Sequence, residues 1–163
     1  DKDVALLTDL LADLGAHALL TALTQLEAGC IRWTRQDEER VTYAEKIGKD
    51  ELSLSPADTV EQACRKVRAS SAAHPAHAII AGKDVTVLAA RPALADRTDA
   101  VCAGMEPGSV RFAAKRLYLG AADGAIELME VKPAGKAAMA AKAFAAGVQG
   151  IKEDTKTWEG PRG

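Results

Sequence analysis

Histidine and serine side chains are the groups in this chain best suited to catalysis, and the sequence does not supply the neighbours they need. His74 and His77 flank Pro75, but no third metal ligand lies nearby, and zinc takes three or four. Ser70 and Ser71 precede His74 without an acid in reach to orient its imidazole as a base. The glycine-rich turns lack a phosphate-loop pattern. We therefore expect no catalytic residue and no metal site, and surface or packing roles for these histidines.

Basic side chains form the candidate functional set, because they gather where predicted strands meet loops. They are Lys83, Arg91, Lys115, Arg116, Lys132 and Lys136. Loops at the ends of small β-barrels bind nucleic acid, and lysine and arginine there would neutralise phosphates in a salt-sensitive way. Ordinary solubilising charge is the alternative for any single one of them. Tyr118 or Trp33 offers a ring for base stacking, although core packing is the expected role of Tyr118.

Composition limits the kind of protein that these basic residues can serve. The 163 residues suit one domain, or one domain plus an appendage, and the net charge is −2. Residues 1–40 hold eight acidic and four basic residues, whereas residues 41–150 hold twelve acidic and fourteen basic ones. This mildly basic middle falls short of the strong positive charge of an autonomous RNA binder.

Several features favour a cytoplasmic protein. Cys30, Cys64 and Cys102 are an odd, widely spaced set, as expected for free thiols in a reducing compartment. The first residues lack the basic-then-apolar layout of a signal peptide. The chain has no run of about 18 apolar residues, so no membrane-spanning helix and no membrane partner are expected.

The first 42 residues predict a helix pair and a linker. Val4, Leu7, Leu11 and Leu14 form one helical stripe that ends at Gly15. A second stripe follows at Leu19, Leu20, Leu23 and Leu26, so residues 1–29 should form two helices. Two short helices cannot bury so much leucine against each other, and they need a partner surface. Residues 30–42 have no apolar period and should be a solvated linker, with a short extended stretch at 41–44.

Residues 43–150 predict a small barrel. Ser55 and Pro56 should begin a helix that reaches about Arg68. Short strands are then predicted over 76–80, 85–90, 110–113, 117–121 and 125–131, followed by a helix over about 139–146. So many short strands with one helix before and one after favour a closed barrel, an α+β fold in which residues 151–163 are a tail.

A short sequence segment near the end of the predicted barrel resembles a family motif. Strand residues 124–131 lead into Val131-Lys132-Pro133-Ala134-Gly135-Lys136-x-x-Met139, which resembles the closing motif of bacterial methionyl-tRNA formyltransferases. The segment Gln36-Asp37-Glu38-x-x-Val41-Thr42-Tyr43-Ala44-Glu45-Lys46-Ile47 looks like the linker of that family, and residues 9–29 look like the end of its catalytic domain. Several such segments in register over about 140 residues are hard to attribute to chance.

The resemblance implies a fragment of a transferase. Residues 1–29 would be the tail of a Rossmann-like catalytic domain lying upstream, and residues 43–150 an OB-like Greek-key barrel that contacts initiator methionyl-tRNA. The family's catalytic Asn, His and Asp have no match here, so these residues alone should lack activity. The intact enzyme would use 10-formyltetrahydrofolate as co-substrate, and this part would bind no cofactor. Lys136 alone of the basic set stands in a matched motif.

Two departures and two alternatives accompany this interpretation. Ala137 and Ala138 replace bases that usually follow the motif lysine, and residues 70–75 replace a Trp or Pro-rich segment that usually follows the first helix of the barrel. The alternatives are the C-terminal part of a sugar-nucleotide formyltransferase, which the linker word at 41–47 disfavours, and a purely structural assembly domain, which the weak net charge favours. Without its catalytic domain, the chain should self-associate through residues 4–26 or fold them onto its own barrel.

Overall fold

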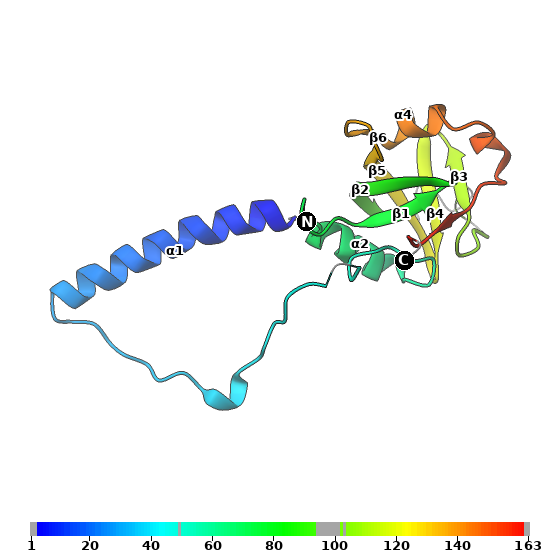
Figure 1. The fold of residues 1–163 in the computed structure, drawn as a ribbon. Coiled ribbons are helices and arrows are strands. Elements are labelled where there is room, and N and C mark those ends of the chain that lie inside the picture. The colour runs from blue at the N-terminus through cyan, green and yellow to red at the C-terminus, as the bar shows by residue number, and fades with distance from the viewer. Residues whose placement is uncertain (1–2, 49, 94–101, 103, 162–163) are drawn as a thin grey trace. The chain divides into compact units, whose positions relative to one another are not determined.

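The computed structural model describes residues 3–48, 50–93, 102 and 104–161, which form two compact units. The first unit covers Asp1–Ile47 and the second covers Gly48–Gly163. The second unit holds all the strands (Figure 1). This arrangement confirms the expected α+β class, in which helical residues precede a nearly closed antiparallel barrel.

One continuous helix, α1 (Val4–Glu27), replaces the expected helix pair. Asp3 caps its start by accepting a hydrogen bond from the Leu6 amide at 2.9 Å. Gly15 does not end the helix, because a mid-helix glycine costs only about 1 kcal/mol and good helix formers follow it. The true end lies at Gly29, whose φ of 67° lets the chain leave the helix.

Most leucines of α1 are exposed, and their two stripes lie on different sides of the helix. The stripe that ends at Leu14 and the stripe that begins at Leu19 are rotated by roughly 130° about the axis, at about 100° per residue. No residue of α1 is buried, and Leu14 and Leu20 remain 66% and 64% exposed. A continuous helix therefore presents both apolar sides at once.

By length and composition alone, α1 could also cross a membrane, although no long unbroken apolar run in the sequence predicts such a helix. Its most apolar window has a mean hydropathy of 1.4, and none of that window is buried. Asp9 and Asp13 lie one turn apart within the helix, and carboxylates are costly inside a bilayer. Helices that another part of a soluble protein covers can have the same composition.

The linker after α1 contains one short helical turn and no strand. The turn η1 (Glu38–Arg40) begins at Asp37, whose side chain accepts from the Glu39 amide at 3.1 Å. The extended stretch expected at 41–44 joins no sheet. Trp33 and Tyr43 are 82% and 91% exposed, so the rings in this segment are solvated.

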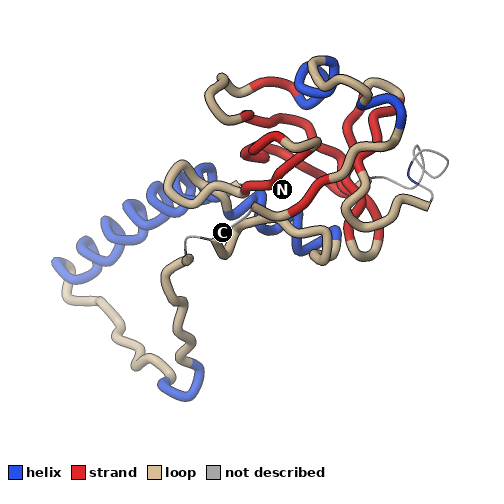
Figure 2. The backbone as a smooth tube through the Cα atoms, turned by 45° about the vertical axis from the view of Figure 1, so that its right-hand side comes forward, coloured by secondary structure: helices blue, strands red, loops and turns tan. Residues whose placement is uncertain are grey.

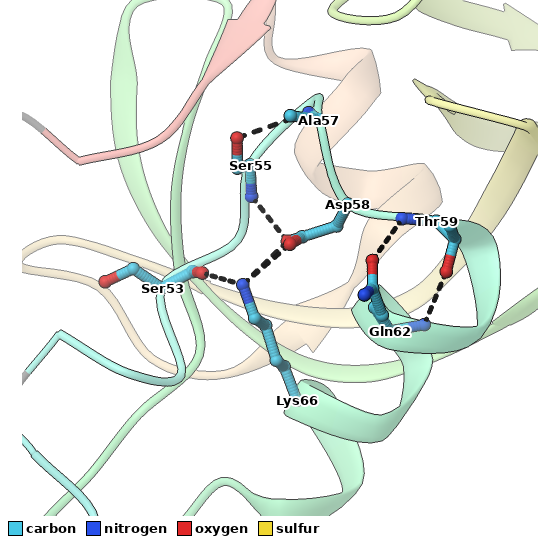
Figure 3. A network of polar contacts seen from close by, with 7 residues as sticks. All are labelled: Ser53, Ser55, Ala57, Asp58, Thr59, Gln62 and Lys66. Carbon is cyan, nitrogen blue, oxygen red and sulfur yellow. Dashed lines mark hydrogen bonds and ion pairs between the residues drawn. The ribbon is translucent and has the colours of Figure 1, made fainter.

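Helix α2 (Val60–Ala69) starts later than the sequence predicts. Ser55 and Asp58 form a turn instead, and Thr59 caps the helix in a capping box with Gln62 (Figure 3). Lys66 reaches back to the Asp58 carboxylate at 2.8 Å and to the Ser53 carbonyl at 2.8 Å. This network fixes the segment before α2 to the helix.

Five of the strands match the predicted ones closely. They are β1 (His77–Ile80), β2 (Lys83–Pro92), β3 (Val110–Ala113), β4 (Arg116–Ala121) and β5 (Gly124–Pro133). All neighbours pair antiparallel, in the order β3-β4-β5-β2-β1-β7. The β2–β5 ladder shifts register around Ala89, which bends the sheet. Figure 2 shows these strands curving about a common interior.

Residues 151–161, which belong to the segment 151–163 that was expected to be a tail, take part in closing the barrel. They contain η2 (Ile151–Glu153) and the short strand β7 (Trp158–Glu159), which pairs with β1. On its other side this segment meets the start of β3, where the Val110 amide donates to the Lys156 carbonyl at 3.0 Å. This C-terminal segment therefore lies between β1 and β3 and hydrogen-bonds to both.

The segment after β5 also differs from prediction. Met139 and Ala140 form the short strand β6, which pairs with β5, and α4 (Ala141–Ala146) begins only after it. Phe144 and Ala145 of α4 pack into the same hydrophobic core as the inward side chains of the strands. Helix α4 thus covers one end of the barrel.

Candidate nucleic-acid interface

Lys83 and Lys136 lie on the rim of one pocket. Strand β5 ends at Pro133, and the Lys136 amide donates to the Pro133 carbonyl at 3.0 Å, with Gly135 at a φ of 71° between them. The Ala134 amide donates to the Asp84 carbonyl at 2.9 Å, which holds this turn against the start of β2. As a result, two lysines more than fifty positions apart share a rim.

The walls of this pocket are mostly apolar. Its volume is about 350 Å³, and its lining comprises Lys83, Asp84, Pro133, Ala134, Lys136, Met139, Ala143, Phe144 and Gly147. The Lys83 ammonium lies 5.9 Å from the centroid of the Phe144 ring, in a cation–π arrangement. An apolar pocket with two cations at its mouth suits an anion that carries an apolar or aromatic part.

Arg91 and Arg116 converge instead on a carboxylate. Arg91 donates from Nε and Nη2 to the Glu127 Oε2 atom at 3.0 and 2.9 Å, and Arg116 Nη1 lies 3.5 Å from the same oxygen. Glu127 is only 6% exposed. Sequence reasoning missed this carboxylate, although register explains it: Glu127 lies opposite Arg91 on β2 and opposite Tyr118 on β4. Part of the charge on both arginines is therefore compensated.

Tyr118 belongs to this cluster and does not offer a ring for stacking. It is 1% exposed, and burial raises the pKa of its phenol, while a hydrogen bond with Arg116 acts in the opposite direction. The expectation that it is a packing residue is confirmed.

Lys115 and Lys132 lie apart from both groups. Lys115 is at the tip of the β3–β4 hairpin, where it and Ala114 have φ values of 62° and 50°. Lys132 is exposed on β5, opposite Thr86. The structure therefore divides the six predicted basic residues into three sets. Lys83 and Lys136 line one pocket, Arg91 and Arg116 contact Glu127, and Lys115 and Lys132 lie at separate surface positions.

The two histidines that flank Pro75 have different surroundings. The His77 Nδ1 atom lies 3.4 Å from both the Asp84 Oδ1 and the Thr86 Oγ1 atoms. The His74 Nδ1 atom is buried without a hydrogen-bond partner among the residues described. Within the described ranges, no three His, Cys, Asp or Glu side chains are placed to hold a metal ion.

A family model described as "Formyl transferase, C-terminal domain" matches residues 46–149. The chain belongs to this family. The methionyl-tRNA formyltransferase of Methylococcus capsulatus is 36% identical over 144 residues, which are 88% of this chain and 45% of that protein. The chain therefore spans less than half the length of this curated relative. The resemblance to a C-terminal part of a formyltransferase is confirmed.

Solved structures support the fold of this family member. HypX from Aquifex aeolicus, in complex with tetrahydrofolic acid, aligns with a TM-score of 0.61 and 21% identity, over 85% of this chain and 24% of HypX. A six-substitution variant of HypX aligns with a TM-score of 0.59 and 22% identity, over 82% of this chain and 24% of the variant. At this identity the likeness bears on the fold alone.

Proposed function

We propose that this chain is the C-terminal part of a methionyl-tRNA formyltransferase, and that its barrel helps to hold initiator methionyl-tRNA for formylation from 10-formyltetrahydrofolate. The observation that carries the proposal is the 36% identity to a methionyl-tRNA formyltransferase over 88% of the chain. A cytoplasmic location follows from this role in protein synthesis.

The physical basis of binding is phosphate neutralisation by basic side chains around the barrel. Lys83 and Lys136 share one rim, and Lys115 and Lys132 are exposed elsewhere on the same unit. Arg91 and Arg116 keep one positive charge between them after Glu127 is counted. Because these charges are few, binding by this part alone should be weak, and it should weaken further as salt rises.

Binding of initiator tRNA should fall as salt rises, and Lys136→Ala should flatten that dependence. Loss of one phosphate contact lowers the slope of log affinity against log salt by about 0.9 on a duplex. Filter binding over a series of salt concentrations measures this slope. Lys142→Ala, a change at an exposed lysine of α4 that does not line the pocket, is the matched control. Absence of binding even at low salt would refute the tRNA-binding role of this part.

Formyl transfer should require the remainder of the enzyme, because the catalytic Asn, His and Asp of the family have no counterpart in this sequence. A purely structural role is the second candidate, and the weak net charge of −2 favours it. Comparing formyl transfer by the intact enzyme with and without residues 48–163 separates the two. A structural domain would change assembly and stability, whereas a tRNA-binding domain would chiefly change the KM for tRNA.

In the intact enzyme, the apolar sides of α1 would be covered by the catalytic domain. In this chain alone they should drive self-association, because large exposed apolar patches seek partners. Sedimentation velocity should show oligomers that grow with concentration, and Leu14→Ser with Leu20→Ser should shift the chain to monomer. Thr21→Ser is the control on the same helix. A wild-type chain that stays monomeric at every concentration would contradict this expectation.

A further inference from the structure

We propose that the pocket between the start of β2, the turn at 133–136 and α4 receives one unpaired nucleotide of a bound RNA. Its base would enter the pocket and its phosphate would lie between Lys83 and Lys136. The inference rests on the proposed function, since it names the part of the RNA that this site takes. Figure 1 shows β6 and α4 together at one end of the barrel, beside β2 and β5.

The size and lining of the pocket suit a single base. Its volume of about 350 Å³ lies near the lower end of small-molecule sites, roughly 300–1,000 Å³. Ala134, Met139 and Ala143 supply apolar wall surface, while Pro133 and Phe144 also line the pocket but are mostly buried, Phe144 being 5% exposed. Proteins hold unpaired bases on such surfaces because every base has an apolar π-face, whatever its sequence.

The charges at the mouth suit one phosphate. Two lysine ammonium groups and the Asp84 carboxylate leave a single positive charge on the rim. Within the described ranges, neither ammonium takes part in an ion pair, so both are available to an anion. The two arginines on Glu127 differ in this respect, because a carboxylate already compensates part of their charge. A phosphodiester carries one negative charge, which would balance the net positive charge of the rim.

Two alanines of α4 allow a matched steric test. Ala143 is exposed and lines this pocket, whereas Ala146 is exposed on the same helix and lines a separate hollow beside Phe112. Ala143→Leu should fill the pocket mouth without removing charge or core packing. It should weaken binding of a fluorescent adenosine tetranucleotide about tenfold, the size of one lost stacking contact, whereas Ala146→Leu should change it less than about twofold. Fluorescence anisotropy with the full chain measures both.

Removal of charge supplies an independent test. Lys83→Met and Lys136→Met keep most of the side-chain length and remove one ammonium each. Each should lower the slope of log affinity against log salt by about 0.7, the value for a single strand, and Lys142→Met should leave it unchanged. In the wild-type chain, NMR amide shifts on adding the tetranucleotide should centre on Lys136 and Gly147.

The outcomes separate this inference from the proposed function. If initiator tRNA binds but Ala143→Leu and Ala146→Leu behave alike, the pocket assignment is wrong and the proposed function stands. If the tetranucleotide does not bind at low salt, or shifts amides far from α4, the pocket assignment is also wrong. If tRNA does not bind but the tetranucleotide does, with Ala143→Leu selectively weakened, the pocket assignment stands and the proposed function fails.

Discussion

A Gly120→Ala variant is expected to lose about 3 kcal/mol or more of folding free energy, among the largest effects of any single change in this chain. A Cβ atom at this position would overlap the Glu106 carbonyl oxygen and lie 2.7 Å from the Ser109 Oγ atom. Backbone cannot retreat as a flexible side chain does. The Gly120 amide also donates to the Ser109 carbonyl at 2.9 Å, so the two segments are tied together at the point of closest approach.

Urea denaturation followed by tryptophan fluorescence measures this loss. Gly147→Ala is the matched control, because Gly147 has a φ of −89° and the nearest atom to its added Cβ, the Phe144 carbonyl oxygen, lies 3.5 Å away. That change should stay within about 0.5 kcal/mol of wild type. Equal denaturation midpoints for Gly120→Ala and wild type would show that residues 106–109 do not approach Gly120 as closely as described.

Trp158→Ala should destabilise the barrel by about 3–5 kcal/mol, the usual cost of emptying a buried tryptophan site. The side chain is 2% exposed, and its Nε1–H donates to the Gly120 carbonyl at 2.9 Å. Its backbone amide donates to the Gly108 carbonyl at 2.8 Å, and the residue pairs with Ile80 of β1. Trp158 thus connects β1 to the segment that leads into β3.

Two further variants separate the contributions of this residue. Trp158→Phe keeps most of the buried ring and removes the Nε1–H bond, and its cost should be nearer 1 kcal/mol because the Gly120 carbonyl still accepts from the Gly108 amide at 3.0 Å. Thr157→Ala, an exposed neighbour, should be nearly neutral. Thermal unfolding by differential scanning calorimetry ranks the three. A loss from Thr157→Ala equal to that from Trp158→Ala would contradict the anchoring role of the indole.

Local signals in the sequence account for most of the barrel. Alternating apolar residues place β1 to β5 within a few positions of their observed ends, and Pro133 with Gly135 marks the turn after β5. Strand β7 could not be predicted this way, because a strand of two residues is too short to show an alternation of apolar and polar side chains. Its formation depends on a partner, Ile80, that lies far away in the sequence.

Local sequence did not predict the continuation of α1 through Gly15 or the partners of the basic residues. Gly15 resembled a helix end, but its neighbours favour helix strongly enough to continue α1 through it. The site prediction identified basic residue types but not their partners. Glu127 joins Arg91 only through the register of β2 against β5, and Phe144 reaches Lys83 only because α4 folds back over the barrel.

On the ribosome β7, which completes the barrel, is synthesised after the other strands that the structure describes, so β1 stays unpaired along one side until then. An unpaired strand of this kind is a template for aggregation. A chain that terminates before Trp158 contains nearly all of the hydrophobic core. It should nevertheless aggregate unless chaperones bind it.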